Sequence, residues 1–310
     1  MSTTPKTGTS ADPGRLPVTL PRLAERKRLR EAIVMVTAYD YPSGLVADAA
    51  GADIVLVGDS GAEVVLGYDA TNVVSTEEML MLTAATRRGV RCALLVADLP
   101  FGSYEVSDEQ AIASAQRFIK QARADAVKLE GGGPAQLSRI RAIVGAGIPV
   151  MGHVGLTPQT ATALGGRRAQ ARTADRALLL AEQARAVEAA GAFAIVFEAI
   201  PAAVAAAITP LLEIPVIGIG AGAETDGQVL VLHDMLGIYP GRAPRFAKQY
   251  VELRSQMVAA IAEYADDVRA HRFPAPEHTF SIDPAELRDF VTELSREAVM
   301  ESDVGRDDGE

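Results

Sequence analysis

Short apolar runs recur along the chain from Ala32 onward, separated by longer segments rich in alanine and charged residues. Within a run, successive positions are apolar and do not alternate with polar ones, which is typical of parallel strands covered by helices. Each run is therefore predicted to form a buried strand. The predicted strands are Ala32–Ala38, Asp53–Val57, Ala93–Ala97, Ala126–Leu129, Ile148–Gly152, Ala192–Phe197, Ile214–Ile219 and Val229–Leu232.

The segments between the runs predict helices, among them Thr76–Arg88, Asp108–Arg123 and Thr173–Ala190. Eight strand-like runs, each followed by a helix or a long loop, predict an α/β fold of the (β/α)8 TIM-barrel type. A doubly wound open sheet is the alternative. The number of runs favours the barrel, and the eighth run is the least regular.

The same pattern divides the chain into three parts. Residues 1–21 form a polar, proline-rich leader that cannot bury apolar surface and is expected to be disordered. Residues 22–272 are expected to form the barrel, with a helix over Pro244–Asp267. Residues 273–310 are expected to form a C-terminal helical extension with one amphipathic helix and an acidic tail.

The helix of the extension is predicted to start at Asp283, a good N-cap that is followed by proline at the first turn and by Glu286 three residues on. Its apolar positions then share one face. We expect this face to pack against the protein or another subunit, which predicts a homo-oligomer. These positions are Leu287, Phe290, Val291 and Leu294.

Charge and cysteine content exclude several classes of function. The chain has 30 Lys and Arg against 40 Asp and Glu, a net charge of −10, so nucleic acid or an anionic membrane is not an expected partner. The single cysteine, Cys92, excludes an intramolecular disulfide and a thiolate metal cluster, and indicates a reducing compartment. No apolar stretch approaches the length of a bilayer span, and residues 1–21 lack a signal-peptide core. We expect a cytoplasmic protein.

Polar side chains end several of the predicted strands. Barrel enzymes build their sites from the carboxyl ends of the strands, so these side chains are expected to converge on one rim. They are Asp59 and Ser60 after the second run, Asp98 after the third, Lys128 and Glu130 at the fourth, His153 at the fifth and Glu198 at the sixth.

Each of these residues also has a structural interpretation. An aspartate after a strand often caps the next helix, which is how we interpret Asp40 and which stays open for Asp59 and Asp98. Lys128 and Glu130 share a strand face and could form an ion pair. For His153, a structural hydrogen bond and a ligand-binding role are both open.

The residue types at this rim favour a hard cation. Carboxylates without thiolates suit Mg²⁺, which usually takes one or two protein carboxylates and leaves its other positions to water and substrate. The glycine-rich segment Gly218–Gly222 comes late in the chain and has no convincing acidic partner, which argues against a dinucleotide site. Glycine there is expected to let the backbone approach a ligand or a phosphate.

The strand-end motifs together resemble the ketopantoate hydroxymethyltransferase family, in order from about residue 21 to about residue 280. One position departs from the family pattern, since Gly61 stands where a larger residue is usual. The stretches that carry the resemblance are Thr37–Asp40, Gly58–Ser60, Val65–Asp69, Ala97–Tyr104, Val127–Gly132, Met151–Gln159, Ile217–Gly222, Asp226–Val231 and Phe273–His278.

The resemblance implies a (β/α)8 barrel, usually assembled as a decamer, that uses Mg²⁺ in pantothenate synthesis. It implies transfer of a hydroxymethyl group from 5,10-methylenetetrahydrofolate to 3-methyl-2-oxobutanoate, giving 2-dehydropantoate. In this chain Asp59 and Asp98 would bind the metal and contact the substrate, and Glu130 would reach the metal. Ser60 and Lys128 would hold the keto acid, and Glu198 would accept its C3 proton.

Two rival functions remain open at this stage. Another Mg²⁺-dependent lyase of 2-oxo or dicarboxylic acids could use a similar rim, although such enzymes often carry a reactive loop cysteine and Cys92 lies elsewhere. A non-catalytic barrel would be expected to have lost Glu198 or a metal-binding aspartate, and this chain keeps them.

Overall fold

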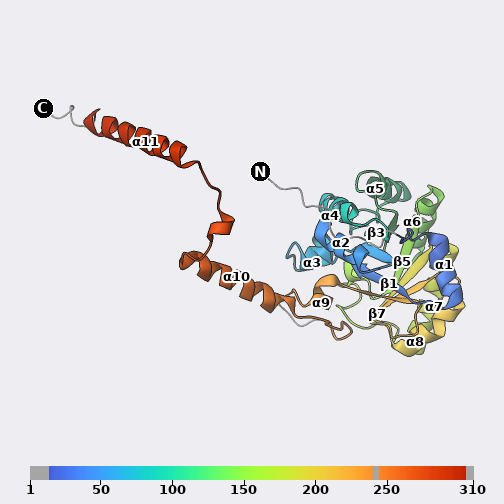
Figure 1. The fold of residues 1–310 in the computed structure, drawn as a ribbon. Coiled ribbons are helices and arrows are strands. Elements are labelled where there is room, and N and C mark those ends of the chain that lie inside the picture. Colours follow the sequence, from blue (N-terminus) through green and yellow to red (C-terminus); the bar gives the residue numbers. More distant parts are fainter. Residues whose placement is uncertain (1–13, 240–243, 305–310) are drawn as a thin grey trace. The chain divides into compact units, whose positions relative to one another are not determined.

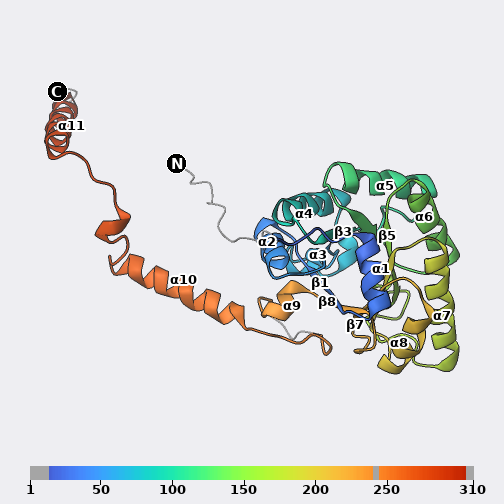
Figure 2. The same ribbon diagram turned by 45° about the vertical axis from the view of Figure 1, so that its right-hand side comes forward.

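The computed structural model describes residues 14–239 and 244–304, with side chains up to residue 297 (Figures 1 and 2). Eight parallel strands close into a barrel in sequence order, with β8 paired to β1. This confirms the predicted (β/α)8 fold. The strands are β1 Ile33–Thr37, β2 Ile54–Val57, β3 Leu94–Asp98, β4 Ala126–Lys128, β5 Val150–Gly155, β6 Ala194–Glu198, β7 Val216–Ile219 and β8 Gly227–Leu230.

Helices alternate with the strands and cover the outside of the barrel (Figure 2). Many begin with a side-chain cap, as at Asp40, where the predicted cap accepts a hydrogen bond from Ser43 N. The helices are α1 Leu20–Leu29, α2 Tyr41–Ala49, α3 Gly61–Val64, α4 Thr76–Gly89, α5 Asp108–Lys120, α6 Pro134–Gly145, α7 Ala174–Ala189, α8 Ala202–Ile208 and α9 Leu232–Leu236. Short 3₁₀ turns occur at η1 Thr71–Val73, η2 Pro158–Thr160 and η3 Thr209–Leu211.

Two apolar clusters hold the barrel together. The larger lies between the strands and the surrounding helices, and the smaller fills the barrel interior with residues such as Met35, Ile54 and Met151. Leu23 of α1 belongs to the interior cluster and is fully buried, so α1 packs onto the barrel interior. This filled interior leaves the strand ends as the place for a site.

Ion pairs fix α1 to the starts of distant strands. Lys27 Nζ lies 2.7 Å from Asp226 Oδ2, just before β8, and Arg26 pairs with Asp53, just before β2. Asp226 also accepts a hydrogen bond from Val216 N and its carbonyl accepts one from Ile33 N. The helix therefore connects β8 with β1 and β2, on both sides of the β8–β1 seam, which is the place where the last strand pairs with the first.

The leader is shorter than predicted. Residues 1–13 lie outside the described residues, whereas Val18 N donates to Cys92 O at 2.7 Å and α1 begins at Leu20. Arg15 donates to Asp48 O and to Ala52 O. The expectation of disorder up to residue 21 was wrong for residues 14–21, because these contacts and the buried Val18 tie the segment to the barrel.

Two other predicted boundaries differ from the structure. The last strand begins at Gly227 and stops before Leu232, which starts α9. Hydrogen bonding to β1, and not apolar content, determines which residues form this strand. The helix predicted over Pro244–Asp267 begins only at Leu253. Upstream of it, Ala247 N donates to Pro244 O in a single turn, and Tyr250 N donates to Met235 O of α9 at 2.8 Å, so the backbone here bonds to the barrel where a helix would bond to itself.

The chain divides into two compact units, residues 1–253 and residues 254–310. The boundary therefore follows residue 253 and not residue 272, where it was predicted. The second unit contains most of α10 (Leu253–Arg269), the turn η4 (Pro276–His278) and α11 (Pro284–Val304). Asp283 Oδ1 accepts a hydrogen bond from Ala285 N at 2.7 Å, as its N-cap role requires. None of the helices described in either unit is long and apolar enough to cross a membrane.

Candidate active site

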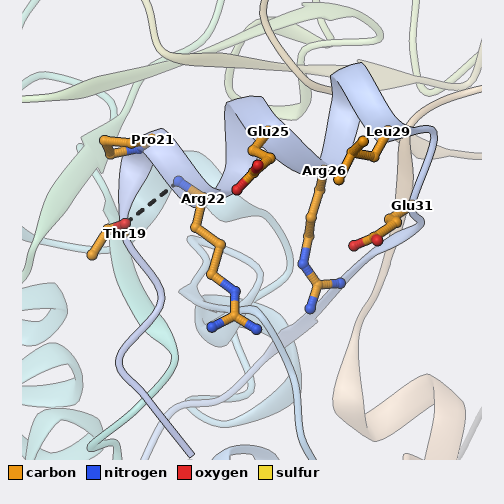
Figure 3. Close-up of a pocket in the computed structure, with 7 residues that line it drawn as sticks. All are labelled: Thr19, Pro21, Arg22, Glu25, Arg26, Leu29 and Glu31. Atoms are coloured by element: carbon orange, nitrogen blue, oxygen red, sulfur yellow. Dashed lines mark hydrogen bonds between the residues drawn. The ribbon is translucent and has the colours of Figure 1, made fainter.

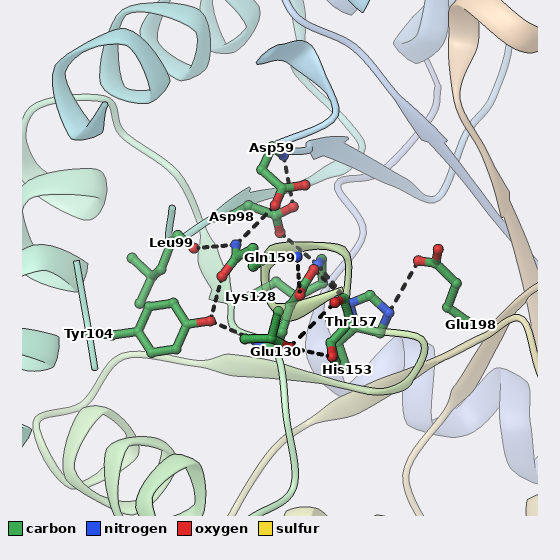
Figure 4. Close-up of polar contacts among 11 residues, drawn as sticks. Asp59, Asp98, Leu99, Tyr104, Lys128, Glu130, His153, Thr157, Gln159 and Glu198 are labelled. Carbon is green, nitrogen blue, oxygen red and sulfur yellow. Dashed lines mark hydrogen bonds and ion pairs between the residues drawn. The ribbon is translucent and has the colours of Figure 1, made fainter. Parts of the chain in front are cut away.

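The predicted strand-end residues converge on one rim of the barrel (Figure 4). Asp59 follows β2, Asp98 ends β3, and Lys128 ends β4. His153 lies inside β5, which runs on to Gly155, and not at its end. The side chains of this cluster are almost fully removed from solvent, apart from Glu198 at 15% exposure and the half-buried Ser60.

Lys128 is the central cation of the cluster. Its Nζ atom lies 3.0 Å from Asp98 Oδ1. Burial lowers the pKa of Lys128, but the charges of Asp98, Glu130 and Asp59 outweigh it and raise the pKa above its ordinary value. Lys128 therefore stays protonated at neutral pH, and its ion-pair partner is Asp98 of the neighbouring strand β3 instead of Glu130, the partner considered from the sequence.

The two aspartates are held against each other and out of water. Asp98 Oδ2 accepts a hydrogen bond from Asp59 N at 3.0 Å, so its contact is with a backbone amide and not a helix cap. Burial, with the charge of Glu130, raises the pKa of Asp59 to about 6 against the opposing charge of Lys128. Burial also raises the pKa of Asp98 to about 6, again opposed by Lys128 and reinforced by Asp59.

His153 connects the two glutamates. Its Nδ1 atom lies 3.3 Å from Lys128 Nζ and 3.4 Å from Glu130 Oε1, and its Nε2 atom lies 3.3 Å from Glu198 Oε2. A neutral ring would accept from Lys128, and a protonated ring would donate to Glu130. In both states Nε2 carries the proton that faces Glu198.

The protonated form of His153 is favoured at neutral pH. Burial and the charge of Lys128 lower the pKa of His153, but its contacts with the two glutamates outweigh them and raise the pKa to about 9. A histidine that is already protonated cannot act as a general base. His153 is therefore a cation of the cluster, with its Nε2 atom 3.3 Å from Glu198 Oε2.

Gln159 and Tyr104 belong to the cluster although the sequence did not single them out for a role. Gln159 Nε2 donates to Asp59 Oδ2 and to Leu99 O, both at 3.0 Å, and Tyr104 OH donates to Gln159 Oε1 at 2.6 Å. Gln159 lies in the turn η2 after β5, inside a motif quoted for the family resemblance. That motif was the only signal that could have found it.

Ser60 lies at the edge of the cluster. Its Oγ atom is 2.8 Å from the hydroxyl of the buried Tyr39. A Cβ atom on Gly61 would lie 2.8 Å from Tyr39 Cδ1, so glycine at this position makes room for the tyrosine ring.

The backbone beside Glu198 is unusual. Ala199 has a φ of 48°, a left-handed conformation that residues other than glycine rarely adopt. The carbonyl of Ala199 accepts a hydrogen bond from Gln170 N, and its amide donates to Ile219 O. Such strain persists only where surrounding contacts impose it, and it is common at functional sites.

The cluster carries more negative than positive charge. Four carboxylates (Asp59, Asp98, Glu130, Glu198) face two cations, Lys128 and His153, which leaves an excess of two negative charges. One divalent cation would balance this excess, so the donor set fits Mg²⁺. Among the described residues, no three His, Cys, Asp or Glu side chains are grouped so that they alone could hold an ion. Protein oxygens would thus supply only part of the coordination, as Mg²⁺ commonly accepts.

The glycine-rich segment after β7 does not form an open cradle. A Cβ atom on Gly222 would lie 2.4 Å from Ala202 Cβ, and one on Gly220 would lie 2.8 Å from the Phe246 ring. Side chains of the protein occupy the space that a Cβ atom would need at both positions, but both glycines also line a cavity at the strand ends, so the expected approach of this backbone to a ligand stays a prediction.

A cavity of about 1620 Å³ opens onto the cluster and continues along the ends of β7 and β8. Its wall includes Asp59, Lys128 and Glu198 together with Tyr239 and Phe246. A second cavity of about 510 Å³ lies beside α1, lined by Thr19, Pro21, Arg22, Glu25, Arg26, Leu29 and Glu31 (Figure 3). It touches none of the strand-end residues, so only the larger cavity is a candidate site.

The raised pKa of Asp59 predicts a pH-dependent effect of Asp59→Asn on stability in the absence of metal. A carboxyl group with a raised pKa stabilises the fold only at low pH, and loses this contribution as the pH rises from 3.8 through about 6. The variant lacks this loss. Between pH 5 and pH 7.5 the wild type loses the part of this contribution that lies between pH 5 and the folded pKa of about 6, which is one pKa unit. The stability of the variant relative to the wild type should therefore be higher at pH 7.5 than at pH 5 by about 1.4 kcal/mol. Urea unfolding in EDTA at both pH values measures this, and an equal difference at both would contradict it.

Comparisons with known proteins identify the family of the chain and agree with its fold. Residues 17–276 match the family described as ketopantoate hydroxymethyltransferase. The 3-methyl-2-oxobutanoate hydroxymethyltransferase of Moorella thermoacetica is 53% identical over 263 residues, covering 85% of this chain and 97% of the relative. The mitochondrial 3-methyl-2-oxobutanoate hydroxymethyltransferase 1 of Arabidopsis thaliana is 47% identical over 285 residues, covering 90% of this chain and 82% of the relative.

Solved structures of other enzymes share the fold at low identity. Phosphonopyruvate hydrolase in complex with oxalate and Mg²⁺ has a TM-score of 0.55 at 14% identity, covering 93% of this chain and 98% of the other. The phosphoenolpyruvate phosphomutase of Streptomyces platensis subsp. rosaceus has a TM-score of 0.54 at 16% identity, covering 92% of this chain and 99% of the other. These likenesses concern the barrel alone. By its sequence over most of its length, the chain belongs to the ketopantoate hydroxymethyltransferase family.

Proposed function

We propose that this enzyme transfers a hydroxymethyl group from 5,10-methylenetetrahydrofolate to 3-methyl-2-oxobutanoate with the help of Mg²⁺, giving 2-dehydropantoate. Its family supports hydroxymethyl transfer to this keto acid. The folate donor and the metal are the proposed parts. The observation that carries the proposal is the buried excess of two negative charges around Lys128, at the strand ends of a barrel.

Asp59 and Asp98 would hold the metal, and Glu130 would reach it through water. When bound, Mg²⁺ supplies Lewis-acid polarisation of the 2-oxo group, which makes the C3 proton more acidic. Lys128 would place a fixed positive charge toward the substrate carboxylate, and Ser60 would donate a hydrogen bond to the keto acid. The near-complete burial of Lys128 strengthens its charge interactions, since little water is present to screen them.

Glu198 would accept the proton from C3. It is the most exposed carboxylate of the cluster and faces the cavity, so substrate can reach it. Its Oε2 atom lies 3.3 Å from Nε2 of His153 in an ion-pair contact, which leaves Oε1 for the substrate. The methylene carbon of the folate donor is bound to two nitrogens, and both carbon–nitrogen bonds would break: one would be replaced by a bond to the oxygen of water and the other by a bond to the deprotonated C3. The C3 proton held by Glu198 and one proton of the water would go to the two nitrogens, which releases tetrahydrofolate.

The size of the cavity supports a reaction with two substrates. Sites for drug-sized ligands usually measure about 300 to 1,000 Å³. A cavity of about 1620 Å³ leaves room for a large second substrate beside a small keto acid. Tyr239 and Phe246 also line this cavity and are partly exposed, which suits a flat ring system.

The rival lyase function lacks a suitable thiol. Cys92 precedes β3, at the opposite end of this strand from Asp98, and its thiol lies 3.3 Å from Arg15 O. Another class of Mg²⁺-dependent lyase that uses a reactive loop cysteine is therefore not favoured.

The cytoplasmic location expected from the single cysteine stays a prediction.

Removal of the metal is expected to abolish most activity. Asp59→Ala deletes a proposed metal ligand, so the variant should fold but lose most Mg²⁺-dependent formation of 2-dehydropantoate from the keto acid and methylenetetrahydrofolate. The wild type in EDTA should show the same loss, and added Mg²⁺ should restore only the wild type. Full activity in EDTA, or unchanged turnover by Asp59→Ala, would refute the metal assignment.

The role of Glu198 as the base is tested by Glu198→Gln, which keeps the size of the side chain but cannot accept a proton. A general base contributes about 10²- to 10⁴-fold, so exchange of the C3 proton of the keto acid with deuterium should slow by that factor. NMR with keto acid and Mg²⁺ but no folate isolates this step. Exchange at the wild-type rate would assign the base to another group.

We also propose a homo-oligomer, with a decamer as the form that the family resemblance implies. Apolar residues of α10 and α11 support this, since Met257, Ile261, Phe290 and Leu294 are each at least half exposed within the chain. Sedimentation at micromolar concentration should therefore give a mass well above the 32.6 kDa of one chain. A monomer under these conditions would contradict the proposal.

A further inference from the structure

Gln159 is the only residue among the described hydrogen bonds that joins Asp59 and Glu130 (Figure 4). Its side-chain Nε2 donates to Asp59 Oδ2 at 3.0 Å, and its backbone N donates to Glu130 Oε2 at 3.0 Å. Gln159 is 3% exposed, so both bonds lie away from water. The residue therefore fixes the spacing between two carboxylates that come from different strands.

The orientation of the Gln159 amide is set by its partners. Tyr104 OH donates to Oε1 at 2.6 Å, and Leu99 O accepts the second proton of Nε2 at 3.0 Å. Burial is the main cause that raises the pKa of Tyr104, so its hydroxyl keeps the proton that it donates. A flipped amide would place its oxygen against Asp59 and its nitrogen against a donor, so only one orientation satisfies all three neighbours.

This arrangement controls which oxygens of the carboxylates are available. Gln159 occupies Oδ2 of Asp59 and Oε2 of Glu130. Among the described residues, Asp59 Oδ1 accepts no hydrogen bond, and Asp59 lines the large cavity. The amide thus holds one oxygen of Asp59 in place and leaves the other for a ligand.

We propose that Gln159, held by Tyr104, is a positioning residue that prepares Asp59 and Glu130 for a divalent cation. The inference rests on the proposed role of Mg²⁺ in this site. Outer partners of metal ligands typically contribute 10- to 100-fold to metal affinity, because they fix the ligand before the ion arrives. Neither Gln159 nor Tyr104 needs to touch the ion or the substrate for this effect.

The test measures binding of Mn²⁺ alone, followed by the loss of the free-ion EPR signal, with Mg²⁺ as competitor. Gln159→Met keeps the length of the side chain and removes the three contacts of its amide, with Asp59, Leu99 and Tyr104. The backbone bond to Glu130 remains, and Mn²⁺ binding should weaken 10- to 100-fold. Tyr104→Phe removes the hydrogen bond that orients the amide, and with it the long 3.4 Å contact of the same hydroxyl with Glu130 N, and should weaken Mn²⁺ binding less. If both act through one network, the double variant should bind no more weakly than Gln159→Met.

Gln228→Met is the matched control. The amide of Gln228 also donates twice, to Gly222 O and to Thr225 Oγ1, and it lines the same cavity without touching a carboxylate of the cluster. This variant should bind Mn²⁺ like the wild type. Circular dichroism and thermal unfolding establish that each variant is folded.

The outcomes separate this inference from the proposed function. Wild-type Mn²⁺ affinity in a folded Gln159→Met protein would overturn the positioning role and leave the metal proposal intact. If Gln159→Met does not fold, Tyr104→Phe decides, and unchanged affinity in that variant overturns the inference. If the wild type itself binds neither Mn²⁺ nor Mg²⁺, the metal proposal fails and the positioning role with it.

Discussion

The ion pair between Lys128 and Asp98 is the interaction on which the active site depends. Both side chains are less than 5% exposed, so neither charge could persist there without the other. Their strands lie next to each other, with Asp98 in register with Lys128, and this pairing brings the charges together. The remaining carboxylates extend the same buried network, whose excess of two negative charges one divalent cation would balance. This imbalance links the fold to the chemistry proposed here.

Much of the fold and of the charged cluster could be predicted because both follow from strand positions. A parallel strand that is buried on both faces needs a continuous apolar run, and the residue that ends the run must lie at the rim. Asp59, Asp98 and Glu198 were found by this logic alone. The extent of β8 could not be found in the same way, because Gly227 and Gln228 join the sheet through backbone bonds to β1.

The sequence could not reveal residues whose role depends on contacts between distant segments. Gln159 is an uncharged residue in a turn, and only the fold brings it to Asp59, a hundred residues away in the chain. The same holds for Arg15, whose contacts lie at Asp48 and Ala52. Composition suggested disorder for its segment, but a few backbone bonds and one buried valine were enough to order it.

The contacts of α1 with the β8–β1 seam have a consequence for synthesis of the chain. Lys27 and Asp226 are separated by almost two hundred residues, and the seam forms only when β8 is available. Until Leu230 has left the ribosome, β1 and β7 each present an unpaired parallel edge, which is a template for association with other chains. Closure over so long a loop is also slow. In a nascent chain, β1 therefore gains its second neighbouring strand only after all the other strands have been made. Until then, cellular factors must protect the two open edges.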